Sequence, residues 1–214
     1  MTTTSTRIQS LPVLDLALLD GSAEDAARFR DELRRATHEV GFFYLVGHGV
    51  PAELIARAFD TARAFFALPD EQKLAIENVT SPHFRGYTRM GGEQTLGKTD
   101  WREQIDIGAE RPGVPLGPGV EDYWVLEGPN LWPEQLPELR EVAEEWIARL
   151  DGVGIRLLRA WAEALGAPAD VFDAAFAEHP SPHMKIARYP GVDAPEPTQG
   201  VGAHKDLGVL TLLY

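Results

Sequence analysis

Apolar residues recur at steps of three or four along three stretches of the chain, a spacing that predicts amphipathic helices. The first stretch has its apolar positions at Ala26, Phe29, Leu33, Ala36 and Val40. Ser22 and Asp25 form a capping-box pattern at its start, and Gly41 follows its end. The sequence therefore predicts a helix between these signals.

The second stretch follows Pro51, a residue that the first turn of a helix accepts, and Pro69 introduces a shorter helix after it. The apolar positions of this second stretch are Leu54, Ala58, Ala62, Phe65 and Phe66. The third stretch, 139–165, keeps helical spacing despite two internal glycines and predicts the longest helix of the chain. A shorter helix is expected at 168–177.

Short segments that are either apolar or, at 103–107, alternate between polar and apolar residues predict strands. They lie at 11–16, 42–46, 103–107, 184–189 and 203–214. The run 42–46 is continuous and aromatic, so we expect it to be buried. Within the last of these strands, the apolar run 209–214 reaches the last residue with no stop signal, and a buried strand needs partners on both edges, so we expect the natural protein to continue. Gly and Pro punctuate 78–133, which predicts long loops of the kind that often carry function.

Composition narrows the class of protein. With 214 residues and 44% hydrophobic content, the chain can bury one sizeable core. A net charge of −13 argues against a nucleic-acid partner, and the absence of cysteine leaves His, Asp and Glu as metal ligands. No apolar run is long enough for a membrane helix and the first ten residues lack a signal-peptide core, so we expect a cytoplasmic protein with no membrane partner.

His204 and Asp206 are the strongest candidates for metal ligands. Side chains at positions i and i+2 of a strand point to one face, so this pair can converge on one ion while Lys205 points away. Two imidazoles and one carboxylate form the facial triad of non-haem iron(II) oxygenases, which would require a second histidine. The alternative is a surface His and Asp at the start of a strand, because the triplet also arises by chance.

A series of motifs gives this pair a context. In chain order they are Gly41-Phe42-Phe43-Tyr44-Leu45-Val46-Gly47-His48-Gly49-Val50, Ala64-Phe65-Phe66-Ala67-Leu68-Pro69, Arg85-Gly86-Tyr87, Asp100-Trp101-Arg102-Glu103, Gly128-Pro129-Asn130-Leu131-Trp132-Pro133, Arg188-Tyr189-Pro190 and Ala203-His204-Lys205-Asp206. Over essentially its whole length, the chain resembles the isopenicillin N synthase-like iron(II)/2-oxoglutarate-dependent oxygenases.

The resemblance implies an α+β fold, in which a helical N-terminal region precedes a distorted double-stranded β-helix, or jelly roll. Residues 1–110 would form the N-terminal helical region with the first barrel strands. Residues 111–214 would form the long helix and the first part of the jelly roll, with the C-terminal strands missing. His204 and Asp206 would bind Fe(2+). The third histidine ligand, and the Arg-x-Ser motif that holds 2-oxoglutarate, would lie beyond Tyr214.

The resemblance also assigns roles to three further residues. Tyr189 matches a tyrosine that often contacts the co-substrate, although Ala187 replaces the family's asparagine. In isopenicillin N synthase the matching tyrosine contacts the substrate instead, and a core tyrosine is the further alternative. Arg85 and Tyr87 match a loop over the barrel mouth, where the guanidinium could bind a substrate carboxylate; a surface arginine is the alternative. His183 and Lys185 share a strand face that could point inward or form a solvated edge.

The implied reaction couples O2 and 2-oxoglutarate to the oxidation of a small organic substrate, with release of succinate and CO2. Hydroxylation, desaturation and cyclisation are all variants in the family, and the sequence does not separate them. One alternative is an iron oxidase without a co-substrate, of the isopenicillin N synthase type. The other is a non-catalytic jelly-roll binding module. Neither the substrate nor the oligomeric state follows from the sequence.

Overall fold

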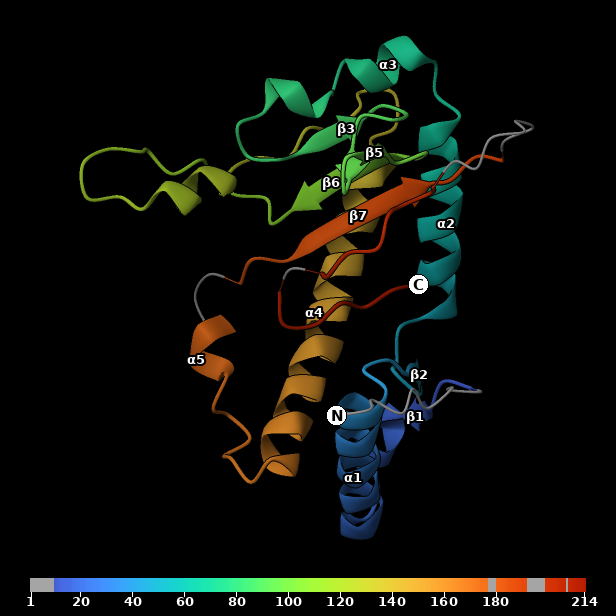
Figure 1. Ribbon diagram of the computed structural model, residues 1–214, viewed down its shortest axis with the longest axis vertical. Coiled ribbons are helices and arrows are strands. Elements are labelled where there is room, and N and C mark those ends of the chain that lie inside the picture. The colour runs from blue at the N-terminus through green and yellow to red at the C-terminus, as the bar shows by residue number, and fades with distance from the viewer. Residues whose placement is uncertain (1–9, 177–179, 192–198, 207) are drawn as a thin grey trace. The chain divides into compact units, whose positions relative to one another are not determined.

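The computed structural model of the protein describes residues 10–176, 180–191, 199–206 and 208–214 (Figure 1). The backbone divides into two compact units, each assembled from segments that are distant in sequence. The first unit comprises Met1–Pro51 and Leu150–His179, and the second comprises Ala52–Arg149 and Pro180–Tyr214. The predicted family regions, 1–110 and 111–214, follow a different division and stay a prediction.

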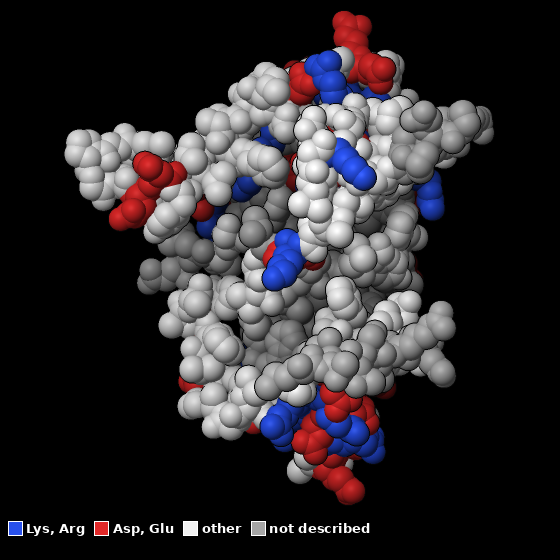
Figure 2. Space-filling view, viewed as in Figure 1, with Lys and Arg blue, Asp and Glu red and all other residues white. Residues whose placement is uncertain are grey.

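In the first unit, helix α1 (Ala23–Glu39) begins with the predicted capping box. Ser22 Oγ accepts from the backbone N–H of Asp25 at 3.1 Å, and Asp25 Oδ2 accepts from the N–H of Ser22 at 3.3 Å. The buried face of the helix consists of Phe29, Leu33 and Ala36. Acidic and basic side chains mix over the solvent side of α1, at the lower end of Figure 2. The sequence signals of this helix are thus confirmed.

Strands β1 (Val13–Asp15) and β2 (Tyr44–Val46) form a parallel pair in the same unit, and a 3-10 helix (Leu16–Asp20) follows β1. Leu14 is 2% exposed, whereas Tyr44 is 62% exposed. The prediction of a strand near 42–46 is confirmed, but its burial is wrong: Phe42 and Val46 are also exposed. A two-stranded sheet has two faces, and no described segment covers this one within the unit.

Helix α4 (Glu138–Ala164) is the predicted longest helix, and its half from Leu150 onward belongs to the first unit. There, Arg156 NH2 donates to Asp20 Oδ2 at 2.8 Å and Trp161 Nε1 donates to Thr37 Oγ1 at 3.3 Å. A short helix, α5 (Asp173–Phe176), follows; residue 177 of the predicted helix lies outside the described residues. Among the helices described, neither α4 nor any other is long and apolar enough to cross a membrane.

The second unit is built on an antiparallel sheet with strand order β3-β6-β7 (Figure 1). Its elements are α2 (Ala52–Phe66), α3 (Asp70–Leu74), a 3-10 turn (Asn78–Thr80), β3 (Gly86–Thr88), the hairpin β4 (Gln94–Thr95) and β5 (Lys98–Thr99), β6 (Glu103–Gly108), a second 3-10 turn (Asp122–Leu126), and β7 (His183–Arg188). The predicted strands near 103–107 and 184–189 are confirmed, and they pair with each other.

One face of this sheet packs on the core of the second unit. In the register of β6 with β7, Ile105 stands opposite Ile186 and Ile107 opposite Met184. The buried members of the core cluster are Phe65, Phe66, Ile76, Tyr87, Ile105, Ile107, Leu139 and Ala143. Because side chains alternate along a strand, the residues between these isoleucines face the other way, and that second face carries the candidate site.

Two further sequence expectations are corrected. The run 203–214 has no strand in its described residues, because no neighbouring strand offers it hydrogen bonds there. The region 78–133, expected to contain one strand, also holds β3, β4 and β5, which are too short to show a periodic pattern.

Candidate functional site

The face of the sheet turned away from the core is polar and buried. Gln104 is 0% exposed and Asp106 is 1% exposed, and both lie on β6 between the core isoleucines. In the register of β6 with β7, Asp106 stands opposite Lys185. A buried carboxylate needs compensating partners, because leaving water costs an ion several kcal/mol. The contacts of Asp106 therefore define the site.

Asp106 is contacted by three side chains from the two strands. His183 Nε2 lies 2.9 Å and Lys185 Nζ 3.4 Å from Oδ1, while Gln104 Nε2 donates to Oδ2 at 2.8 Å. Burial acts to raise the pKa of Asp106, but the hydrogen bond from His183, the Lys185 charge and the Gln104 amide outweigh it and lower the pKa. Asp106 is thus a charged hub on this face.

The network continues from Gln104 toward Tyr189. Gln104 Nε2 also donates to Glu93 Oε1 at 2.9 Å, and Glu93 Oε2 accepts from Arg102 NH2 at 2.5 Å. Arg102 NH1 in turn donates to the Tyr189 hydroxyl at 3.3 Å. Tyr189 is 50% exposed and directly follows β7, so its hydroxyl combines access to solvent with a cationic neighbour.

His204 and Asp206 meet although they do not lie on a strand. His204 Nε2 is 3.2 Å from Asp206 Oδ1, and the side chains are 47% and 54% exposed. The other ring nitrogen, Nδ1, lies 2.8 Å from the carbonyl oxygen of Gly202, which can only accept, so Nδ1 carries the proton in this bond. Within the described ranges, no group of three or more potential ligands surrounds the pair.

Arg85, which directly precedes β3, is buried and not exposed on the surface. It is 8% exposed, and its NH1 donates to the carbonyls of His83 and Phe84 at 2.8 and 3.1 Å. Its NH2 donates to the Leu126 carbonyl at 3.1 Å. Burial lowers the pKa of Arg85, against the opposing charges of Asp106, Glu127 and Glu110. The guanidinium thus fastens two backbone segments together, and the predicted contact with substrate stays a prediction.

Tyr87 lies on β3 with its ring in the core cluster and is 3% exposed. Its hydroxyl donates to Glu103 Oε2 at 2.6 Å, and its ring meets Phe65 edge to face. Burial and the bond to Glu103 raise its pKa well above the usual range. The phenol is therefore engaged in packing, and its predicted role in substrate binding likewise stays a prediction.

Sequence reasoning missed Asp106 as the hub of the polar face and left His183 and Lys185 between two alternatives. The structure turns both side chains toward Asp106 and leaves them partly exposed, at 44% and 31%. The signal was the alternation of polar and apolar residues in 103–107, which implies a polar face as well as a buried one. Assigning partners to that face also required the pairing of β6 with β7.

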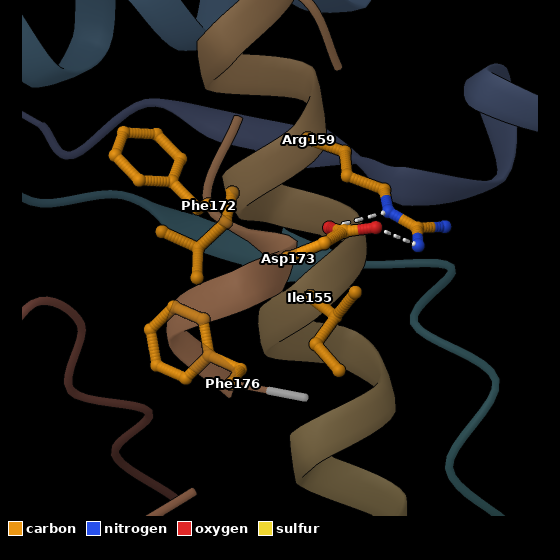
Figure 3. A pocket seen from close by; sticks show the side chains of 6 residues that line it. Ile155, Arg159, Phe172, Asp173 and Phe176 are labelled. Carbon is orange, nitrogen blue, oxygen red and sulfur yellow. Dashed lines mark hydrogen bonds and ion pairs between the residues drawn. The ribbon is translucent and has the colours of Figure 1, made fainter. Parts of the chain in front are cut away.

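A separate apolar cavity lies in the first unit, between α4 and α5 (Figure 3). Its lining residues are Ile155, Leu158, Arg159, Phe172, Asp173 and Phe176. The only charged groups in this lining neutralise each other, since Arg159 Nε and NH2 donate to the two oxygens of Asp173 at 3.1 and 2.5 Å. The cavity therefore presents no free acid, base or nucleophile.

Comparison with known proteins places these features in a family context. The profile described as "non-haem dioxygenase in morphine synthesis N-terminal" matches residues 11–135, which is more than half of the chain. The 2-oxoglutarate-dependent dioxygenase frbJ of Dothideomycetidae sp. (strain 11243) is 43% identical over 92% of this chain and 53% of its own length. Homoarginine-6-hydroxylase 2-ODD-C23.1 of Arabidopsis thaliana is 35% identical over 98% of this chain and 66% of its own length.

A solved structure shows the same architecture. The crystal structure of a 2OG-Fe(II) oxygenase family protein from Caulobacter crescentus matches with a TM-score of 0.71 and 28% identity. The match covers 86% of this chain and 58% of that protein. The chain thus spans between about half and two thirds of the length of these similar proteins.

Proposed function

The chain belongs to the family of non-haem, 2-oxoglutarate-dependent dioxygenases, and from this membership we propose that it forms part of an iron(II) enzyme that oxidises a small organic molecule. The reaction would consume O2 and 2-oxoglutarate and release succinate and CO2. The observation that carries the proposal is the convergence of His204 Nε2 and Asp206 Oδ1, 3.2 Å apart, in a segment whose sequence resembles the family's HxD motif.

The two side chains fit a divalent metal. Because Nδ1 of His204 donates to the Gly202 carbonyl, Nε2 is the ring nitrogen that faces the Asp206 carboxylate, and in the neutral imidazole it carries the lone pair. Two acceptors at this distance repel each other unless a cation or a proton lies between them. One imidazole and one carboxylate are ligand types that suit iron(II), and their exposure leaves a path from solvent. The third ligand would come from a histidine beyond Tyr214.

When bound, the iron would hold 2-oxoglutarate and O2 and supply the oxidising power. The chain's own residues would bind and orient. Arg102 donates to the Tyr189 oxygen, which leaves the phenolic proton free to bond a carboxylate of the co-substrate. On the polar face, His183 and Lys185 are partly exposed beside Asp106 and offer an imidazole and a cation to a substrate with polar groups.

The remaining parts of the proposal concern the fold and the setting. Strands contributed from beyond Tyr214 would complete the jelly roll, with 1–110 and 111–214 as its two regions, and the location would be cytoplasmic. The relative that hydroxylates homoarginine supports a small polar substrate, as does the charged sheet face. The anion contact at Arg85 has less support, because backbone carbonyls occupy that guanidinium.

The test uses the complete protein and pairs Asp206→Ala with Lys205→Ala, a control that removes an exposed side chain between the two proposed ligands. We expect Asp206→Ala to abolish succinate formation and anaerobic Fe(II) binding with an unchanged circular-dichroism spectrum, and Lys205→Ala to retain both. Equal Fe(II) affinity in wild type and Asp206→Ala would refute the metal assignment. Substrate oxidation without succinate would indicate the co-substrate-independent oxidase, and neither activity nor metal binding would indicate a binding module.

A further inference from the structure

Asp100 is a fully buried carboxylate whose contacts are distributed between its two oxygens. It is 0% exposed and directly follows β5. Oδ2 accepts from Thr95 Oγ1 at 2.7 Å, while Oδ1 accepts from Gln199 Nε2 at 2.9 Å and from the backbone N–H of Gly202 at 3.2 Å. Oδ1 is therefore the side of Asp100 that holds the segment leading into the proposed metal ligands.

The segment 199–202 is fastened to Asp100 along its backbone as well. Trp101 N–H donates to the Gln199 carbonyl at 2.8 Å, and Asp100 and Gln199 form a parallel β-bridge. A side chain at Gly202 has no room, because an added Cβ would lie 2.7 Å from Thr95 Cγ2 and 2.8 Å from Thr95 Cβ. Gly202 therefore packs closely against Thr95, which itself donates to Asp100.

Gly202 links Asp100 to His204 through two hydrogen bonds. Its N–H donates to Asp100 Oδ1, and its carbonyl accepts from His204 Nδ1 at 2.8 Å. The carbonyl fixes both the tautomer and the orientation of the imidazole, which presents Nε2 to Asp206. Partners that orient a metal-binding histidine typically change metal affinity by roughly 10–100-fold when removed.

We propose that Asp100 is a positioning residue for the metal site: by holding the N–H of Gly202, it places the carbonyl that orients His204. The inference rests on the proposed metal role of His204 and Asp206. Arg102 NH2 lies 3.6 Å from Oδ2 and offsets part of the cost of burying the charge, while Oδ1 is occupied by Gln199 and Gly202. The charge strengthens the bond to Gly202, because charge-assisted hydrogen bonds are about twice as strong as neutral ones.

The experiment measures the Kd of the complete protein for Co(II), without 2-oxoglutarate and under anaerobic conditions, from the absorption of the bound ion. The variants are Asp100→Ala, which removes the acceptor, and Asp100→Asn, which keeps one acceptor oxygen without the charge. Thr95→Val is the matched control, because it removes the donor to Oδ2 at constant shape and leaves the Gly202 bond in place.

We expect Asp100→Ala to raise the Kd tenfold or more, Asp100→Asn to raise it by an intermediate factor above three, and Thr95→Val to leave it within twofold of wild type. The absorption bands of bound Co(II) should shift in the Asp100 variants only, which a loss of stability alone would not produce. If Asp100→Ala does not fold, the Kd of Asp100→Asn for Co(II) is the test, and a rise of more than threefold over wild type supports the inference.

Two outcomes overturn the inference while leaving the proposed function intact. In the first, a folded Asp100→Ala, or Asp100→Asn in its place, binds Co(II) within threefold of wild type. In the second, Thr95→Val weakens binding as much as the Asp100 variants do, which would reduce Asp100 to a general structural role. A wild-type protein that binds no more Co(II) than His204→Ala would instead refute the proposed function itself.

Discussion

Lys73 and Glu103 form a buried ion pair, with 3.0 Å between Nζ and Oε2 and side-chain exposures of 4% and 2%. The Tyr87 hydroxyl donates to the same carboxylate oxygen at 2.6 Å, and the Arg188 guanidinium contacts the other oxygen. Because these residues come from α3, β6, β3 and β7, one carboxylate fastens a helix to all three strands of the sheet.

Removing one member of this pair should destabilise the second unit strongly. Lys73→Met leaves the Glu103 carboxylate buried with one cation fewer, and breaking a buried pair typically costs roughly 3–5 kcal/mol. We expect a loss of roughly 3 kcal/mol in the free energy of unfolding, measured by urea denaturation, because Arg188 still compensates part of the charge.

Lys98→Met is the control for that variant, since Lys98 is exposed on the β4-β5 hairpin. Its free energy of unfolding should stay within about 0.5 kcal/mol of wild type. A loss of less than about 1 kcal/mol in Lys73→Met would show that the ion pair contributes little beyond its desolvation cost.

Gly86 at the start of β3 allows a second stability prediction. Its φ is +107°, and an added Cβ would lie 2.4 Å from the carbonyl oxygen of Ile76, which accepts from Tyr87 N–H at 2.8 Å. Gly119 has a φ of +85° with nothing within 4 Å of an added Cβ. Gly119→Ala should therefore cost only the backbone term, roughly 1–2 kcal/mol.

Gly86→Ala should cost at least about 2 kcal/mol more than Gly119→Ala, because the clash with a backbone carbonyl adds to the backbone strain. Chemical denaturation of both variants checks the difference. Equal losses would mean that β3 shifts away from Ile76 without penalty, and the close approach would then have no energetic importance.

The sequence predicted the elements whose signals are local. The capping box of Ser22 and Asp25 needs only three residues of chain, and the alternation in 103–107 identifies β6 without its neighbours. The short strand β3 was missed, because its pairing with β6 depends on residues about 20 positions away. The exposure of Tyr44 was missed because an apolar run does not reveal which of its faces is covered.

In the candidate site, too, only the features with a local sequence signal could be predicted. The proximity of His204 and Asp206 could be predicted from their spacing, although the strand expected to hold them is absent from the described residues; their role as metal ligands stays a proposal. The contact between Asp106 and His183 could not be predicted, because it joins residues 77 positions apart through the register of β6 and β7. Likewise, only the folded backbone brings Gly202 to Asp100.

Asp106 predicts a dependence of stability on pH. Its pKa lies below the usual 3.8, although burial opposes this, because His183, Lys185 and Gln104 stabilise the carboxylate. A group whose pKa is depressed by folding contributes stability above its unfolded pKa, and that contribution is lost as pH falls through the folded pKa. We expect wild type to exceed Asp106→Asn in stability most near pH 6, with the difference shrinking below about pH 4.

Urea denaturation of both proteins at a series of pH values measures this difference. Asp122→Asn serves as control, because Asp122 is exposed and the described residues give it no ion-pair partner; its offset from wild type should not vary with pH. A constant gap between wild type and Asp106→Asn from pH 6 to below pH 4 would contradict the stabilised carboxylate.

A substitution at Arg85 tests whether its guanidinium holds the backbone or binds the substrate. Its NH1 holds the carbonyls of His83 and Phe84 while its NH2 holds that of Leu126, so the planar group joins two segments at once. A lysine ammonium is a single point and cannot reproduce this fork. Arg85→Lys should therefore lower the free energy of unfolding by roughly 1–3 kcal/mol, because buried carbonyls lose their donors.

Kinetics of the complete enzyme with matched anionic and esterified substrates separates the two roles. If Arg85 only holds the backbone, Arg85→Lys should change KM by the same factor for both substrates, and Arg63→Lys, a substitution at an exposed ion pair, should change neither stability nor KM. A tenfold rise in KM confined to the anionic substrate, about 1.4 kcal/mol, together with wild-type stability would establish the anion contact instead. Since Arg85 is 8% exposed and two of its guanidinium nitrogens donate to three carbonyls, we expect the equal response.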